Sequence, residues 1–126
     1  MIGYRIRAFA LSTALAIIWA APPAIAGQFD GPWQMVAVTT SGHCGKIPIG
    51  FGIDRGRIYS TGGSFASHPI QLGGRVSASG QASLNAVAGS RIAHGTGRFN
   101  RLRGSGTWAG TGPSGVCSGV WSAIRS

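Results

Sequence analysis

The chain has two cysteines, Cys44 and Cys117, and this pair constrains its fold more than any other sequence feature. Each cysteine is preceded by Ser-Gly-x and comes a short run after a Gly-x-Trp sequence, so the two lie in similar local settings. A disulfide requires the two Cα atoms to lie within about 7 Å of each other. Because 117 − 44 = 73 positions separate the cysteines, a bond between them would bring the end of the domain back to its start.

The first 26 residues predict an export signal. Arg5 and Arg7 form a positive start, residues 8–21 are mostly apolar, and Ala-Ile-Ala follows as a cleavage sequence. The alternative, an uncleaved membrane anchor, is disfavoured because the apolar run is shorter than the ~20 residues that span a bilayer. We therefore expect a helical signal peptide at residues 1–26 and one domain at residues 27–126. We expect no membrane span after cleavage, and a periplasmic or secreted location.

Export favours a disulfide between Cys44 and Cys117, because exported proteins meet an oxidising environment. A free reactive thiol and an intermolecular bridge are the alternatives. Closing so long a loop would stabilise the fold by about 4 kcal/mol on the loop-entropy model. That is a large share of the net stability of a small domain.

Short runs that alternate apolar residues with polar residues or glycine predict an all-β domain. The clearest run is residues 47–53. The expected strands cover residues 33–40, 47–53, 57–61, 67–72 (a weaker strand), 75–79, 81–87, 91–102, 104–111 and 116–124. The side chains expected to face inward include Trp33, Met35, Ala37, Ile47, Ile49, Phe51, Ile53, Val76, Ala78, Ala82 and Leu84.

About eight strands with short connections indicate a small antiparallel up-and-down barrel or a curved meander. Cys44 follows the end of the first expected strand, and Cys117 begins the last. The end of one strand lies beside the start of another only when the two strands run antiparallel. In a meander the first and last strands are antiparallel only when the number of strands is even, so the cysteine pair favours a closed barrel of eight strands.

No sequence motif predicts catalysis, and we expect no catalytic residues. Gly110–Gly115 formally matches G-x-G-x-x-G but lacks the helix that a dinucleotide site needs. Gly62–Ala66 comes close to a nucleophile elbow, again without a following helix. The only acidic residues, Asp30 and Asp54, are too far apart in sequence to suggest a pair of catalytic carboxylates. The protein is therefore expected not to be an enzyme.

The three histidines, His43, His68 and His94, match no metal-binding spacing, so we expect neither a metal site nor a cofactor. His43 and His68 fall in expected loops. His94 alternates in register with Ile92, which suggests that its side chain points inward.

The charge of the expected domain is one-sided. Without Arg5 and Arg7, nine basic residues oppose two aspartates, a formal net charge of 9 − 2 = +7. The one local cluster, Arg98, Arg101 and Arg103, is the candidate anion-binding site, and anionic envelope polymers or lipids are the expected partners. A charge that serves only solubility is the alternative. Nucleic acid is not expected as a partner of an exported protein.

Three motifs carry a resemblance to known proteins. The domain opens on Phe29–Trp33, and it ends on Gly104–Trp108 and Cys117–Trp121. With the signal peptide and the first cysteine, this arrangement resembles a group of small, uncharacterised exported β-rich proteins of alphaproteobacteria over most of the domain. That resemblance implies an exported location and no particular activity. The Gly-x-Trp opening and the late tryptophans also resemble avidin-type small barrels, a likeness limited to these motifs.

Two functions are compatible with these features. The leading hypothesis is a non-catalytic exported β-domain with a cationic surface that binds a partner or associates with the cell envelope. The alternative is a small-ligand carrier with an apolar site in a barrel mouth. The candidate wall residues of that site are Trp33, Trp108 and Trp121.

Overall fold

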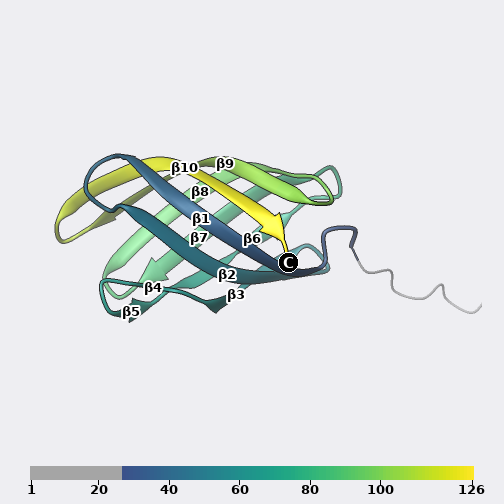
Figure 1. Ribbon diagram of the computed structural model, residues 1–126, viewed down its shortest axis with the longest axis horizontal. Coiled ribbons are helices and arrows are strands. Elements are labelled where there is room, and N and C mark those ends of the chain that lie inside the picture. The colour runs from purple at the N-terminus through teal and green to yellow at the C-terminus, as the bar shows by residue number, and fades with distance from the viewer. Residues whose placement is uncertain (1–26) are drawn as a thin grey trace, which may run out of the picture.

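The structure, a computed structural model, describes residues 27–126 and contains ten strands and no helix within them (Figure 1). The strands are β1 (Gly31–Ser41), β2 (Lys46–Asp54), β3 (Arg57–Gly62), β4 (Ser64–Phe65), β5 (His68–Pro69), β6 (Gln71–Val76), β7 (Gln81–Ala88), β8 (Arg91–Phe99), β9 (Arg103–Gly112) and β10 (Gly115–Arg125). Eight of them close into a barrel in the order β1-β10-β9-β8-β7-β6-β3-β2, and β4 and β5 pair separately. The prediction of an all-β closed barrel is confirmed.

The predicted signal peptide, residues 1–26, lies outside the described residues. Among the residues that are described, no helix is long and apolar enough to cross a membrane.

The barrel closes where its first and last strands meet. β1 and β10 run antiparallel, with Cα partners from Trp33↔Arg125 to Thr39↔Gly119. Cys44 in the β1–β2 loop and Cys117 near the start of β10 form the predicted disulfide, with Cα atoms 6.2 Å apart. The predicted relation between the cysteine pair and an even number of strands is therefore confirmed.

Two predicted strands meet in a single strand, β6, which covers the end of the first and the start of the second. The sequence suggests separate strands at residues 67–72 and 75–79, but β6 continues through Gly73 and Gly74, which pair with β7. A side chain at Gly74 would collide with the Ser83 carbonyl. These glycines therefore permit a close approach of β7, and they do not interrupt the strand. Ala78, predicted to face inward, is exposed in the turn that follows β6.

β8 is shorter than predicted because a side chain closes the turn after it. The sequence suggests a strand that continues to Leu102, whereas β8 ends at Phe99. The Asn100 Oδ1 atom accepts hydrogen bonds from the N–H groups of Leu102 (2.9 Å) and Arg103 (2.8 Å). Asparagine favours turns through such local bonds to the backbone.

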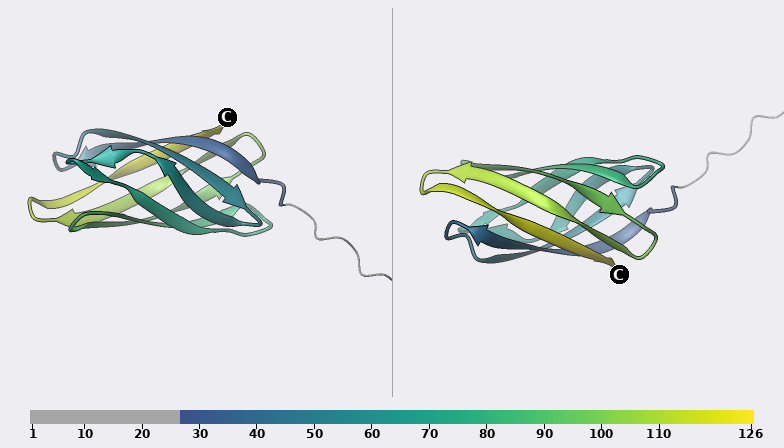
Figure 2. Two further views of the ribbon diagram at one scale, coloured as in Figure 1. Left: turned by 90° about the horizontal axis from the view of Figure 1, so that it is seen from below. Right: turned by 90° about the horizontal axis from the view of Figure 1, so that it is seen from above.

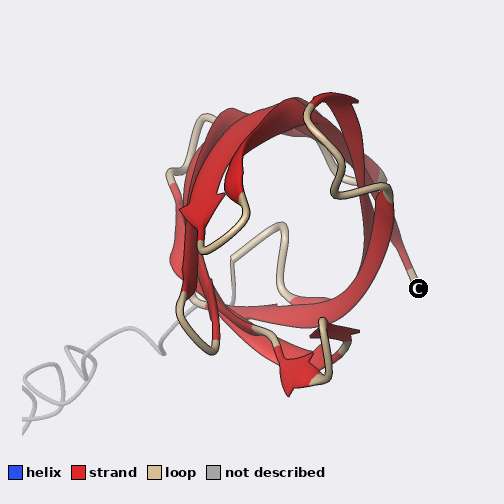
Figure 3. Ribbon diagram, turned by 90° about the vertical axis from the view of Figure 1, so that its left-hand side faces the viewer, coloured by secondary structure: helices blue, strands red, loops and turns tan. Residues whose placement is uncertain are grey.

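The two ends of the barrel differ, and we name them the closed end and the open end. The closed end carries residues 27–30, the C-terminus and the β2–β3, β6–β7 and β8–β9 turns; Figure 2 shows both termini of the described chain at this end. The open end carries the β1–β2, β7–β8 and β9–β10 connections and the small β4–β5 sheet, which lies at its rim in Figure 3.

Aromatic rings fill the half of the lumen next to the closed end. The Phe99 ring lies at the centre, with ring centroids 5.0 Å from Trp33, 6.2 Å from Phe51 and 5.5 Å from Trp121. Phe29, from the segment before β1, packs against Phe99 and covers the group from the closed end. Such aromatic contacts add to the stability gained by burying the rings.

Arg125 links three segments of the chain at the closed end. Its guanidinium donates hydrogen bonds to the carbonyls of Gln28 (3.0 Å), Arg101 (2.7 Å) and Asp30, and it lies 5.3 Å from the centre of the Trp33 ring. The Trp33 indole N–H donates to the Phe29 carbonyl at 2.8 Å. The end of β10, the segment before β1 and the β8–β9 turn are therefore held together around one side chain.

Candidate ligand-binding cavity

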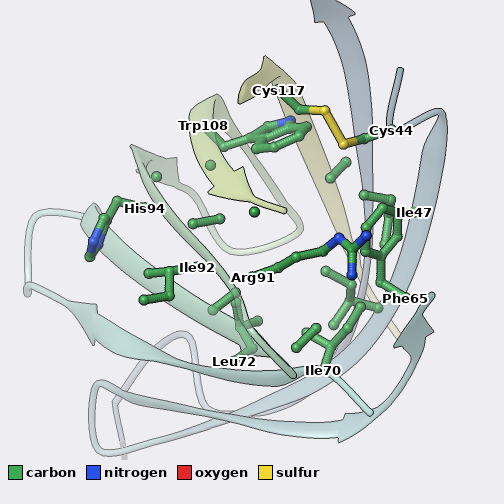
Figure 4. A pocket seen from close by; sticks show the side chains of 18 of the residues that line it. Cys44, Ile47, Phe65, Ile70, Leu72, Arg91, Ile92, His94, Trp108 and Cys117 are labelled. Atoms are coloured by element: carbon green, nitrogen blue, oxygen red, sulfur yellow. A yellow bond between two sulfur atoms is a disulfide. The ribbon is translucent and has the colours of Figure 1, made fainter. Parts of the chain in front are cut away.

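The half of the lumen next to the open end contains a cavity of about 110 Å³ (Figure 4). Its walls are mostly apolar side chains from eight of the ten strands, all except β3 and β5, and from the connections at this end. They include Met35, Ala37, Ile47, Ile49, Phe65, Ile70, Leu72, Leu84, Ala86, Ala88, Trp108 and Trp121. Trp121, only 2 % exposed, belongs both to this lining and to the aromatic group of the closed half.

The cavity exists because several inward positions near the open end carry small residues. Ala37, Ala86, Ala88, Ala93 and Gly110 all line it. The inward positions of the other half also include glycines, but there large rings fill the space that the glycines leave. Toward the open end Ala86, Ala93 and Gly110 lie side by side as Cα partners on β7, β8 and β9, and this part of the wall carries only short side chains.

The mouth of the cavity is bordered by the disulfide and by Trp108 and Phe65. Figure 4 shows the indole of Trp108 beside the Cys44–Cys117 bond on one side and Phe65 across from it. Phe65 comes from the small β4–β5 sheet at the rim. The disulfide therefore fixes the β1–β2 loop directly at the mouth.

Arg91 places a cation across this mouth. It is the first residue of β8, and its side chain extends toward Phe65 and Ile47 (Figure 4), with the guanidinium carbon 5.2 Å from the centre of the Phe65 ring. A side chain at Gly112 would collide with Arg91, so that glycine leaves room for the arginine. The only acidic residues of the chain, Asp30 and Asp54, belong to the closed end. Arg91 thus has no carboxylate partner at the open end.

The Trp108 side chain offers a second donor. Its indole N–H is buried, and within residues 27–126 it has no hydrogen-bond partner. Buried N–H groups in proteins nearly always have a partner. The arrangement can accept an apolar body in the cavity, a negatively charged group beside Arg91, and a hydrogen-bond acceptor near Trp108.

The structure separates the three tryptophans proposed as ligand-wall residues. Trp108 and Trp121 line the cavity. Trp33 lies in the closed half, stacked on Phe51 at a ring-centroid distance of 6.2 Å, and does not line it. Arg91, Ala86, Ala88 and Ala93 were not predicted as site residues from the sequence. The signal that could have identified the cavity is the run of small residues at inward positions near one end of successive strands.

The prediction that His94 points inward is wrong. Figure 4 shows its side chain directed away from the cavity, and His94 and Ile92 both lie on the exposed face of β8. The inward positions of this strand are Arg91, Ala93, Gly95, Gly97 and Phe99. The Trp121 ring occupies the space beside Gly95 and Gly97. This face of β8 therefore has no room for large side chains at those two positions, and it faces the lumen, while the face that carries Ile92 points outward.

No group of catalytic or metal-binding residues forms in the part of the chain that the structure describes. His43 and His68 lie at the open end, whereas Asp30 and Asp54 lie at the closed end, so no Ser-His-Asp arrangement is brought together. Within residues 27–126, no three His, Cys, Asp or Glu side chains lie close enough to hold a metal ion.

The candidate anion-binding residues lie away from the cavity. Arg98, at the end of β8, and Arg101 and Arg103, in and after the next turn, are exposed at the closed end. The cationic cluster and the cavity are therefore separate features at opposite ends of the barrel.

Comparisons with known proteins add no information about the site. No family model matches the chain, and none of the curated proteins matches it significantly.

Proposed function

We propose that this protein is a non-catalytic exported carrier that holds a small amphipathic anion in the open half of its barrel. The observation that supports this function is the difference between the two halves of the lumen: one is packed with aromatic rings, and the other is left open and lined with apolar groups. The disulfide is compatible with an oxidising compartment, which supports export.

The size of the cavity limits the buried part of the ligand. An apolar cavity of roughly 150 Å³ stays dry and binds a molecule such as benzene, and this one has about 110 Å³. It can bury one ring, or a few methylene groups that contribute about 0.8 kcal/mol apiece. The remainder of a longer ligand would extend through the mouth, past the disulfide.

The charge at the mouth indicates which end of the ligand faces outward. Arg91 is a cation next to an apolar lumen and has no carboxylate partner there. A guanidinium binds carboxylate, sulfonate or phosphate oxygens through charge-assisted hydrogen bonds. We therefore place the apolar part of the ligand in the lumen and its acidic group beside Arg91.

Filling the cavity tests this function. Because Ala86 lines the cavity, Ala86→Leu should occupy part of the space that the ligand needs. Titration with decanoate, followed by tryptophan fluorescence, should show binding to the wild type. The variant should bind about tenfold more weakly, since displacing even two methylene groups costs about 1.6 kcal/mol.

A matched control is available on the outer wall. Ala109 lies on the exposed face of β9, so Ala109→Leu adds the same side chain outside the barrel and should bind decanoate as the wild type does. Thermal unfolding verifies that both variants are folded. Equal binding by the two variants, or no binding by the wild type, would contradict the proposal.

A further inference from the structure

The basic residues gather at the closed end of the barrel. Of the nine lysines and arginines within residues 27–126, only Lys46 and Arg91 lie at the open end. The other seven lie in the turns and strand ends of the closed end: Arg55, Arg57, Arg75, Arg98, Arg101, Arg103 and Arg125. They are dispersed in sequence and converge because alternate connections of an up-and-down barrel meet at the same end.

The two aspartates of this end neutralise little of that charge. The Asp30 carboxylate accepts hydrogen bonds from the backbone N–H groups of Gly27 and Arg55. Asp54 contacts the Arg55 side chain at 3.9 Å, and both side chains are well exposed. This is the only ion pair within the described residues, and an exposed pair of this kind stabilises the fold little. Apart from Arg125, which is bound to carbonyls, the remaining arginines have no partner of opposite charge in this part of the chain.

Two of these arginines face each other directly. Arg57 on β3 and Arg75 on β6 are Cα partners, and both are exposed on the outer wall. Like charges directly opposite each other across a sheet are destabilising. Arg55, Arg75 and Arg98 also line a shallow groove on the outer wall together with hydroxyl and amide groups, among them Ser77, Gln81, Ser83 and Thr96. Guanidinium groups among such donors suit the oxygens of phosphate groups.

A large apolar side chain projects from the same end. Leu102 lies in the β8–β9 turn between Arg101 and Arg103, and 67 % of its surface is exposed. The two hydrogen bonds to Asn100 Oδ1 hold this turn in place. At the surface of an anionic membrane the leucine can enter the acyl boundary while the arginines contact the headgroups.

We propose that the closed end of the barrel docks on a membrane surface rich in anionic phospholipids. In this orientation Leu102 and the arginines around it face the lipid, and the mouth of the cavity points away from the membrane. This proposal does not depend on the cavity, because the two features lie at opposite ends of the molecule.

Vesicle binding tests the docking surface. The protein from residue 27 onward is sedimented with vesicles of phosphatidylcholine alone, or with about one-third phosphatidylglycerol added. We expect binding only to the anionic vesicles, weakened as ionic strength rises. The double substitution Arg101→Ser and Arg103→Ser should lower the partition coefficient about 25-fold, since each arginine contributes about fivefold. Leu102→Ser should lower it about tenfold.

Controls separate this proposal from its alternatives. Lys46→Ser removes a cation from the opposite end and should leave vesicle binding unchanged. A loss of vesicle binding equal to that caused by removing one arginine of the closed end would show that only net charge matters. Binding to dextran sulfate but not to anionic vesicles, or vesicle binding that Leu102→Ser leaves intact, would overturn the lipid surface in favour of a polyanionic polymer. Ala86→Leu should bind vesicles as the wild type does. A failure of the carrier proposal can therefore be distinguished from a failure of the docking proposal.

Discussion

Single glycines decide where the lumen of this barrel is filled. Gly97 on β8 and Gly106 on β9 are Cα partners. A side chain at Gly97 would collide with the Ser105 carbonyl and with the Trp121 ring, and one at Gly106 would collide with the Thr96 carbonyl. The two glycines therefore leave the inner wall without side chains where the Trp121 ring lies. The sequence shows that the chain is rich in glycine, but it does not show which glycines face a ring and which face a cavity.

Gly106→Ala tests this close approach. The added methyl group would have to displace backbone atoms of β8, and such overpacking costs about 1–3 kcal/mol. Chemical denaturation should show a loss of that size in the free energy of unfolding. Gly62→Ala is the matched control, because nothing lies within 4 Å of the position that its Cβ would occupy, and it should change stability by less than about 0.5 kcal/mol. Equal effects of the two substitutions would show that glycine content matters and the contact with β8 does not.

Among the elements, β1 and β10 are the pair that closes the barrel. They meet although one begins the described chain and the other ends it, and the disulfide stabilises their contact at the open end. This arrangement could be predicted from the sequence, because the position of each cysteine relative to its strand required antiparallel neighbours and an even strand number. The alternation in residues 47–53 likewise identified the inward face of β2 correctly.

Alternation was less informative for β6 and β8. The glycines of β6 suggested a break, whereas they permit close pairing with β7. On β8 the middle of the inward face carries only Ala93, Gly95 and Gly97, and Ile92 is 49 % exposed, so the hydrophobic pattern pointed to the wrong face. In both strands the deciding factor is a residue on another strand, Ser83 on β7 or Trp121 on β10, and a pattern within one strand cannot show it.

Reduction of the disulfide tests the contribution of the β1–β10 closure. The bond spans 73 positions, and on the loop-entropy model its loss lowers the free energy of unfolding by about 4 kcal/mol. Denaturant titrations with and without reductant should show this difference, and the double substitution Cys44→Ser and Cys117→Ser should reproduce it. A difference below about 1 kcal/mol would mean that the reduced unfolded chain retains structure, or that strain in the native state offsets the entropic gain from the disulfide.

At the scale of the whole molecule, the up-and-down topology gives the barrel two ends of different composition. Every second connection comes to the same end, which gathers seven dispersed arginines at the closed end and the apolar mouth at the other. The barrel itself could be predicted from the sequence. The two ends could not, because their residues come together only after all eight strands are in register.

The measurement that tests the carrier proposal most directly compares decanoate with decanol by calorimetry. These ligands share an alkyl chain and differ in the charge of the head. In the wild type decanoate should bind at least about tenfold more tightly, because a charge-assisted hydrogen bond contributes about 1.5–3 kcal/mol. Arg91→Met should abolish that difference and leave decanol binding unchanged, whereas Lys46→Met, at the same end of the barrel, should preserve the difference. Equal affinity of the wild type for the two ligands, or a preference for decanoate that survives Arg91→Met, would contradict a carrier of amphipathic anions in the open half of the barrel.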